Sequence, residues 1–437
     1  MSTKKRRKCF KTKLTLFLIN LLLILIVSGC SGYSMKTEDS GESIPLEMGR
    51  GVLNSLPEAD RYNPQPSEVD LRSYDLTSTD MAGRLEDLIC ADFDTLTRWP
   101  YDLPEGFEPK RIMNLGKNPG LGISKLHDRG ITGNGIGVAL ICSPLLTNHK
   151  EYVNNLVYYS NDGDASMTAT ASGCMAASIV CGKTTGVAPG VSLYCFTSKS
   201  IVDASGETSE KTRFLIKTLE SIIQLNGLEK KDDEEPGAEP DSEPDPEKEN
   251  TGLKKYLQIK IVCISFDGIE ECLADTEVKS LIRDLIENDV FIVSTSLYDM
   301  YKGEIDFNGL GREPLDSPDD FKSWLPGRVW ENSFYSFGRY SRAIKTMLVP
   351  ADKRTVASPT GENDYAYYSA ADKSGAVPYI AGLYALASQV VPDLTPERFW
   401  DTAWETGEEI TIKKNNIRYS LKRVVNPQKI IEKLKIK

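Results

Sequence analysis

The chain has 437 residues, of which 40% are hydrophobic, and a net charge of −11 at pH 7. This length is sufficient for one large α/β core and additional segments. Seven of the 52 basic residues and none of the 63 acidic residues lie in the first 30 positions, so the rest of the chain carries a net charge of −18. Such a surface repels phosphates and anionic lipid headgroups, and we therefore expect no nucleic-acid partner.

The first 30 residues have the layout of a bacterial lipoprotein signal peptide. Seven basic residues within positions 4–13 precede an apolar run over 14–27. This run is shorter than the about 20 apolar residues of a membrane-spanning helix. The small residues before Cys30 resemble a lipobox, so we expect removal of residues 1–29 and attachment of Cys30, through several acyl chains, to the extracytoplasmic face of the bacterial cell membrane. An uncleaved N-terminal anchor is the alternative, and it also places the following residues outside the cytoplasm.

The other cysteines of the expected mature chain indicate neither a disulfide framework nor a metal site. Their number, seven, is odd, and their spacing matches no metal-binding signature. Several have apolar neighbours on both sides, which is typical of a cysteine that acts as a small buried hydrophobic residue. We expect no metal and no cofactor. These residues are Cys90, Cys142, Cys174, Cys181, Cys195, Cys263 and Cys272.

Strand-like and helix-like segments alternate along the chain from residue 120 onward. Residues 30–84 are polar and lack sustained periodicity, so we expect a flexible stem followed by one domain over residues 85–437. Apolar runs of strand length alternate with amphipathic stretches, which predicts an α/β fold with a mainly parallel sheet and helices on both faces. The predicted strands are 136–142, 191–196, 259–266 and 290–294, and the predicted helices are 121–129, 173–181, 211–226, 275–287 and 426–437.

An acidic segment interrupts this alternation at residues 229–250. Positions 229–249 hold 11 acidic residues, three lysines and four prolines. A segment of this composition cannot bury enough apolar surface to fold, so we predict a disordered insertion within the domain. Calcium binding by its carboxylates is a weaker alternative, because the segment shows no coordination spacing.

Three blocks of the sequence resemble, in the same order, motifs of the subtilisin-like serine peptidases (subtilases). Residues 120–141 resemble the helix, glycine turn and first sheet strand of that family. Residues 173–190 resemble its second motif with the Gly-Val-Ala-Pro turn, and residues 374–382 resemble the block of its nucleophilic serine. The resemblance covers residues 110–430 apart from the acidic insertion. It implies a three-layer subtilisin-like α/β fold in which Ser374 lies at the start of a central helix.

Two of the three catalytic positions that the resemblance implies hold other residue types. Cys142 replaces the aspartate that orients the family's histidine, and Ser172 replaces the histidine itself. The nucleophile position keeps its serine, Ser374. Residues 295–298 follow the strand after which the family carries its oxyanion asparagine, and they contain no asparagine.

The chemistry of the missing residues argues against peptidase activity. A serine hydroxyl is a weak nucleophile until a neighbouring base removes its proton. In subtilisin itself, the family's namesake, loss of the base lowers turnover by on the order of 10⁶. Loss of the oxyanion donor, again with subtilisin as the reference, costs about 10²–10³.

We find no substitute for the base in the sequence. The two histidines, His127 and His149, are expected at the surface or behind the site. Lys373 is expected to point away from Ser374, because adjacent residues at a helix start diverge. Cys142 would need a base of its own, so a buried inert thiol is the simpler interpretation. A serine that heads a helix is also a common N-cap, which explains Ser374 without catalysis.

These replacements favour a pseudopeptidase, a cell-surface lipoprotein that binds peptide or protein partners. The resemblance assigns pairing with the backbone of the peptide to an edge strand formed by Ser265, Phe266, Asp267 and Gly268. The alternative is an active serine endopeptidase with a rearranged triad or one completed by a partner chain. A third possibility is an architectural envelope protein, and a sheltered apolar groove beside Ser374 would favour binding over this role.

Overall fold

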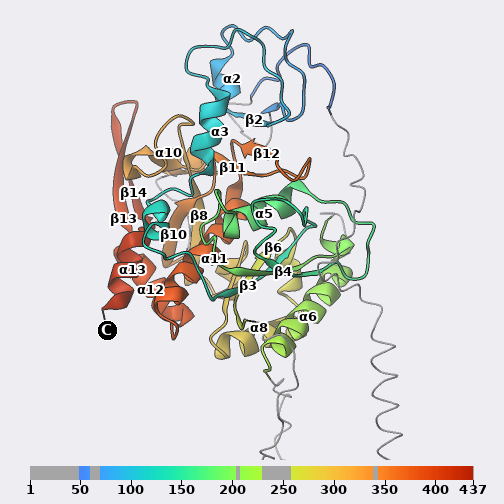
Figure 1. The fold of residues 1–437 in the computed structure, drawn as a ribbon. Coiled ribbons are helices and arrows are strands. Elements are labelled where there is room, and N and C mark those ends of the chain that lie inside the picture. Colours follow the sequence, from blue (N-terminus) through green and yellow to red (C-terminus); the bar gives the residue numbers. More distant parts are fainter. Residues whose placement is uncertain (1–48, 60–68, 203–206, 229–256, 338–342, 437) are drawn as a thin grey trace, which may run out of the picture.

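A computed structural model describes residues 49–59, 69–202, 207–228, 257–337 and 343–436 (Figure 1). The expected signal peptide, Cys30 and the acidic insertion at 229–250 lie outside the described residues. Within the described part of the chain, no helix combines the length and the apolar character that a membrane crossing requires.

A five-stranded parallel sheet forms the centre of the molecule. Each predicted strand is confirmed to within about two residues, and all five strands pair in parallel. The four predicted strands are short apolar runs that are mostly buried, as is typical of parallel strands covered on both faces, whereas β4 is only partly buried. Ile141 pairs with Phe196 on one side, and Cys142 pairs with Ser265 on the other. In spatial order the strands are β4 (Leu156–Ser160), β5 (Ser192–Phe196), β3 (Gly137–Cys142), β6 (Ile259–Ser265) and β7 (Phe291–Ser294).

Helices cover both faces of this sheet, which confirms the predicted α/β class. Alternate residues of β3 enter two different apolar clusters: Leu140 packs with side chains of the helices on one face, and Ile141 with those on the other. The helices of the first face are α5 (Ala171–Cys181) and α11 (Asp372–Val390), and those of the second are α6 (Thr208–Leu225) and α8 (Thr276–Glu287). Short helices connect the strands: α4 (Ile123–His127), η1 (Lys199–Ile201), α7 (Ile269–Cys272) and α9 (Leu297–Met300).

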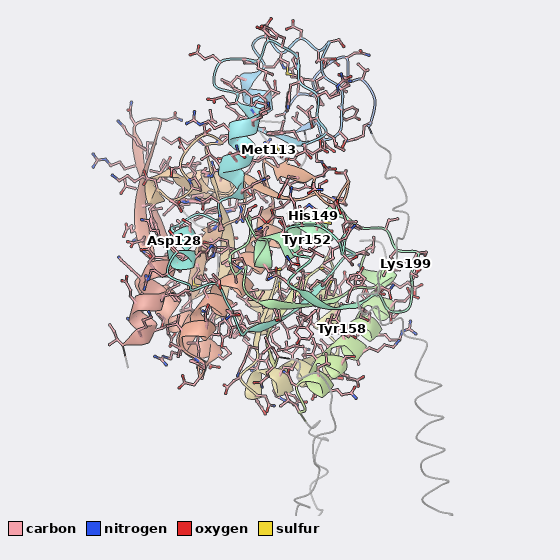
Figure 2. The ribbon with its side chains drawn as sticks, viewed as in Figure 1. Met113, Asp128, His149, Tyr152, Tyr158 and Lys199 are labelled. Atoms are coloured by element: carbon pink, nitrogen blue, oxygen red, sulfur yellow. The ribbon has the colours of Figure 1, made fainter. Side chains whose placement is uncertain are left out.

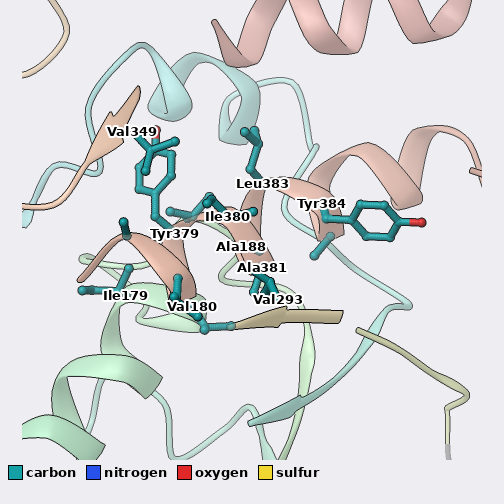
Figure 3. Packing of buried hydrophobic residues seen from close by; sticks show 14 of the residues in the cluster. Ile179, Val180, Ala188, Val293, Val349, Tyr379, Ile380, Ala381, Leu383 and Tyr384 are labelled. Atoms are coloured by element: carbon teal, nitrogen blue, oxygen red, sulfur yellow. The ribbon is translucent and has the colours of Figure 1, made fainter. Parts of the chain in front are cut away.

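Helix α11 runs through the core and packs against both α5 and strand β10 (Lys345–Pro350) (Figure 3). Its small residues allow this close approach: a Cβ on Gly382 would lie 2.6 Å from the Cβ of Val187. Further along, the ring of Tyr384 stacks on Phe291 of β7 with centroids 4.0 Å apart. The predicted central helix with Ser374 in its first turn is therefore confirmed.

Strands from the C-terminal part of the chain form a second five-stranded sheet. Strands β8 (Ile305–Arg312), β10 (Lys345–Pro350) and β14 (Ile417–Val424) run parallel to one another, while β9 (Trp324–Pro326) and β13 (Glu408–Lys414) pair antiparallel at its edges. The helical segments around it are η2 (Phe321–Ser323), α10 (Glu331–Phe337), α12 (Pro396–Thr406) and α13 (Pro427–Lys435). Ile430, Ile431 and Leu434 of α13 are buried, so the predicted C-terminal helix packs on the body of the protein.

The predicted boundary of a flexible stem at residue 84 needs a correction. Leu71, Leu76 and Met81 are buried in one apolar cluster with Phe93 and Tyr367. They belong to a lobe that lies at the top of Figure 1. In this lobe, short strands from distant parts of the chain pair with one another. This lobe contains β1 (Val69–Asp70), α2 (Leu85–Ile89), β2 (Ala91–Asp94), α3 (Pro109–Lys117), β11 (Arg354–Ala357) and β12 (Tyr365–Tyr368).

Candidate functional site

Ser374 lies in the first turn of α11 and is half-buried. Its Oγ donates a hydrogen bond to the carbonyl oxygen of Ala371 at 2.5 Å. Ala371 occupies the N-cap position of the helix and α11 begins at Asp372, so the interpretation of Ser374 as the N-cap is wrong. The hydroxyl proton of Ser374 is directed at a backbone carbonyl, which cannot act as a general base.

Lys373 points away from Ser374, as expected. Its Nζ lies 2.8 Å from Oδ1 of Asp306 on β8 and 5.2 Å from the ring centroid of Phe307. An ammonium group that is paired with a carboxylate donates protons in hydrogen bonds and has no free electron pair to accept one. Lys373 therefore does not replace the missing base.

Neither histidine is available to Ser374. His149 is fully buried, so of the two places expected for it, the surface is excluded, and its ring lies beside that of Tyr152 with centroids 5.4 Å apart (Figure 2). Its Nε2 is 2.8 Å from the carbonyl oxygen of Asp364, and its Nδ1 accepts a hydrogen bond from the amide of Glu151 at 3.2 Å. These two contacts fix a neutral tautomer with the proton on Nε2. Burial lowers the pKa of His149.

The second histidine has a backbone partner as well. Nε2 of His127 lies 2.8 Å from the carbonyl oxygen of Val187, in the turn that follows α5. Burial lowers the pKa of His127. The prediction that neither histidine serves as a base for Ser374 agrees with these contacts.

Cys142 ends β3 and is fully buried. Its Sγ lies 3.9 Å from Sγ of Cys195 on the neighbouring strand β5, and both thiols are free. Burial raises the pKa of Cys195 well above its ordinary value. The prediction of a buried thiol at position 142 is confirmed, and the neighbour of this thiol is a second thiol, Cys195.

Ser172 is exposed in the first turn of α5. Its Oγ lies 3.3 Å from Oγ1 of Thr170, the residue that caps the helix by accepting a hydrogen bond from the amide of Gly173. Cys142, Ser172 and Ser374 thus each have a different partner: a thiol, a helix-cap hydroxyl and a backbone carbonyl. The described contacts do not join the three positions into a catalytic unit.

A cavity of about 370 Å³ opens beside Ser374, and we call it the Ser374 pocket. It lies where the turns after β6 and β7 meet the first turn of α11. Because parallel strands end at the same edge of a sheet, residues that follow them converge there, and ligands of α/β proteins bind at such edges. The pocket is lined by Asp267, Gly268, Glu270, Thr295, Ser296, Tyr298, Asp299, Lys373 and Ser374.

The pocket unites some of the predicted site residues and leaves others out. Ser374, Asp267 and Gly268 line it together, as predicted for a nucleophile position and a substrate segment. Cys142 and Ser172 are not among the lining residues.

The predicted edge strand is wrong. Strand β6 is central in its sheet, because β3 pairs with one side of it and β7 with the other. Ser265 is the last residue of β6, and Phe266 is buried. Gly268 then has a φ of +85° and precedes α7, so the chain turns where an extended edge was expected. Residues 266–268 therefore form a turn and not an extended edge strand.

Sequence reasoning missed Glu270 and Asp299 as members of the site. Together with Asp267 they place three exposed carboxylates on the lining of the pocket. Each follows a strand of the parallel sheet by only a few residues, Glu270 after β6 and Asp299 after β7, which is the signal that would have identified it. The described residues contain no group of three or more histidine, cysteine or carboxylate side chains suited to hold a metal ion.

Comparisons with known proteins concern the fold alone. No protein-family model and no curated protein sequence matches the chain. Solved structures similar to it are subtilisin-like proteases. The prenylagaramide maturation protease PagA is 16% identical over 72% of this chain and 98% of its own, with a TM-score of 0.44. A cold-adapted subtilisin-like serine proteinase is 17% identical over 64% of this chain and 84% of its own, with a TM-score of 0.38. Fervidolysin from Fervidobacterium pennivorans, a keratinolytic enzyme related to subtilisin, is 12% identical over 76% of this chain and 49% of its own, with a TM-score of 0.45.

Proposed function

We propose that this chain is a catalytically inactive subtilisin-like module that binds peptide or protein segments at the bacterial cell surface. The observation that carries the proposal is the environment of Ser374. Its hydroxyl donates to the carbonyl of Ala371, and no hydrogen bond among the described residues links it to a general base, yet it lines an open cavity of about 370 Å³. A site with room for a ligand, in which the serine is not hydrogen-bonded to a general base, supports binding more than turnover.

The size of the pocket supports binding over a purely architectural role. Ligand sites in proteins have volumes of about 300–1,000 Å³, and the Ser374 pocket lies at the lower end of this range. A space of this size accommodates one long side chain of a peptide. Its lining is polar and is not the sheltered apolar groove that was named as the sign favouring binding over an architectural role, so recognition would depend on charge and hydrogen bonds.

Attachment to the membrane through Cys30 completes the proposal. The basic and then apolar leader with a small-residue motif before Cys30 supports export and acylation. The pocket would then face partners outside the cytoplasm, and an acidic surface with a net charge of −18 would disfavour anionic ones.

Active-site labelling of the full chain in detergent tests the absence of catalysis. A fluorophosphonate probe reacts only with a serine whose hydroxyl is activated, so we expect no labelling of the native chain or of Ser374→Ala. An active subtilisin at the same concentration is the positive control. Labelling of the native chain that is lost in Ser374→Ala would overturn the proposal and favour the alternative, an active serine endopeptidase with a rearranged or partner-completed triad.

A further inference from the structure

The Ser374 pocket has an excess of negative charge. Asp267, Glu270 and Asp299 line it, all three side chains are exposed, and within the described part of the chain none of them forms an ion pair. Lys373 is the one cation in the lining, and Asp306 offsets its charge at 2.8 Å. Lys211 also lies beside the pocket, where its Nζ donates a hydrogen bond to the carbonyl oxygen of Asp267 at 3.4 Å, but one further cation does not balance three carboxylates. The pocket therefore presents an excess of negative charge to a ligand.

A second observation at the same place indicates a ligand with hydrogen-bond donors. Ser296 lines the pocket and is only 4% exposed, and its Oγ has no hydrogen-bond partner among the described residues. A buried hydroxyl without a partner costs free energy, since it has lost its hydrogen bonds to water. A donor group of a bound ligand would restore one of these hydrogen bonds.

We infer that the Ser374 pocket binds the cationic side chain of a lysine or arginine in a peptide or protein partner. The inference rests on the proposed binding function and specifies its ligand class. A lysine or arginine side chain has an apolar stem of three or four methylene groups that can extend into a cavity, and a head group with several donors for carboxylates and hydroxyls. Three carboxylates and one hydroxyl acceptor match these donors in charge and in chemistry.

Other ligand classes fit the lining less well. Carboxylates or phosphates would meet like charges at Asp267, Glu270 and Asp299, which disfavours their binding. An apolar side chain would remove water from the polar lining groups without replacing their hydrogen bonds. A basic side chain satisfies the same groups, so the charge of the pocket selects it.

Binding of matched peptides to the full chain in detergent tests the inference. Fluorescein-labelled, end-blocked hexapeptides of alanine and serine would carry one central arginine, lysine, norleucine or glutamate, with anisotropy as the readout. We expect the arginine and lysine peptides to bind at least about tenfold more tightly than the norleucine peptide, with a preference that weakens as the salt concentration rises. The glutamate peptide should bind most weakly.

A triple variant links this preference to the pocket. In Asp267→Asn/Glu270→Gln/Asp299→Asn, we expect the preference for cationic peptides to fall about tenfold, because three exposed charge pairs are lost and each contributes up to about fivefold. A control of equal charge change at exposed acids outside the pocket lining is Asp102→Asn/Glu105→Gln/Asp128→Asn, which should bind like the native chain. Thermal unfolding of each variant checks that it is folded.

The outcomes separate this inference from the function on which it rests. Peptides that bind equally well whatever their central residue would overturn the inference and leave peptide binding in place. Equal losses in the pocket variant and in the control would also overturn it, because the effect would then come from overall charge. A complete lack of peptide binding, with no probe labelling, would overturn both this inference and the proposed binding function.

Discussion

Lys373 and Asp306 form an ion pair, with Nζ and Oδ1 2.8 Å apart, directly beside the serine that occupies the nucleophile position. The side chains are 28% and 10% exposed, so water screens the pair only in part. The pair joins the first turn of α11 to strand β8 and uses the one cation that lines the pocket. Its position explains both why Lys373 cannot serve as a base and why the carboxylates of the pocket keep their excess negative charge.

We predict that Asp306→Asn destabilises the protein by about 1–3 kcal/mol. The substitution leaves the partly buried ammonium of Lys373 without its carboxylate, and loss of one partner costs more than loss of both. The double variant Asp306→Asn/Lys373→Met should therefore regain part of the stability. Urea unfolding of the full chain measures both changes, and equal stability of the native and Asp306→Asn proteins would show that the pair is not a structural contact.

Stability should fall as the pH decreases below about 6.5, because burial lowers the pKa values of His149 and His127. In the unfolded chain a histidine binds its proton near pH 6.5. The folded state holds the neutral form to a lower pH, so the unfolded state binds more protons in between and stability is lost as the pH falls. The stabilisation is fully present above this range, and each histidine can contribute a slope of up to about 1.4 kcal/mol per pH unit.

The variant His149→Gln isolates the contribution of the buried histidine. Glutamine does not titrate, and its amide can still donate to the carbonyl of Asp364 that His149 contacts. We expect a smaller slope of the unfolding free energy between pH 6.5 and 5 than in the native chain. The pKa of the neighbouring Glu151 is lowered from an ordinary value of 4.5, so its own effect falls at lower pH. An unchanged slope would mean that folding does not lower the pKa of His149.

Cell fractionation tests the membrane attachment on which the proposed location depends. In a bacterial host, we expect the native chain in the membrane fraction and labelled by an alkyne fatty acid, since the lipobox-like motif ends at Cys30. Cys30→Ser should lose the lipid label. Cys90→Ser is the matched control, because Cys90 lies within the folded body and should not affect labelling. Equal labelling of the native chain and Cys30→Ser would contradict lipidation at this residue.

The central sheet could be predicted from the sequence because its signals are local. The run at 136–142 is apolar throughout, and glycine turns mark its start, so its length and burial are visible without any partner strand. The place of Ser374 at the start of α11 was instead implied by the resemblance to the subtilases. What the residues alone did not supply was the place of β6 between two strands, which depends on pairing with β3 and β7.

The lobe that contains β1 and β2 shows more clearly which features the sequence alone does not predict. Strand β1 has two residues and β2 has four, so neither produces a periodic pattern. The lobe is held by contacts between distant parts of the chain: the carboxylate of Asp94 accepts hydrogen bonds from Ser73, and the ring of Phe93 lies 4.9 Å from that of Tyr367. Such contacts become visible only once the fold brings the segments together, and for this reason a stem was expected.

Removal of residues before 85 should therefore unfold the lobe. We expect a chain that starts at residue 85 to lose cooperative unfolding, whereas one that starts at residue 49 retains it. The single substitution Leu71→Ala should cost about 2–5 kcal/mol, because Leu71 is fully buried in the cluster of the lobe. Leu257→Ala, at a 41% exposed leucine, is the control and should cost much less. Equal stability of the chains that start at 49 and 85 would restore the idea of an independent stem.

Restoring the residue types of an active triad should not restore activity. In Cys142→Asp the new carboxylate would lie at a fully buried position, where the side chain of residue 142 now contacts the thiol of Cys195. An uncompensated buried carboxylate is costly, so we expect a loss of at least about 3 kcal/mol in unfolding free energy, against about 1 kcal/mol for Cys142→Ser. Ser172 is exposed, so Ser172→His should be tolerated.

The double variant Cys142→Asp/Ser172→His would then fail to react with a fluorophosphonate, because the hydroxyl of Ser374 still points to the carbonyl of Ala371. Labelling of that double variant would show instead that the catalytic geometry persists and that only two side chains separate this protein from a peptidase.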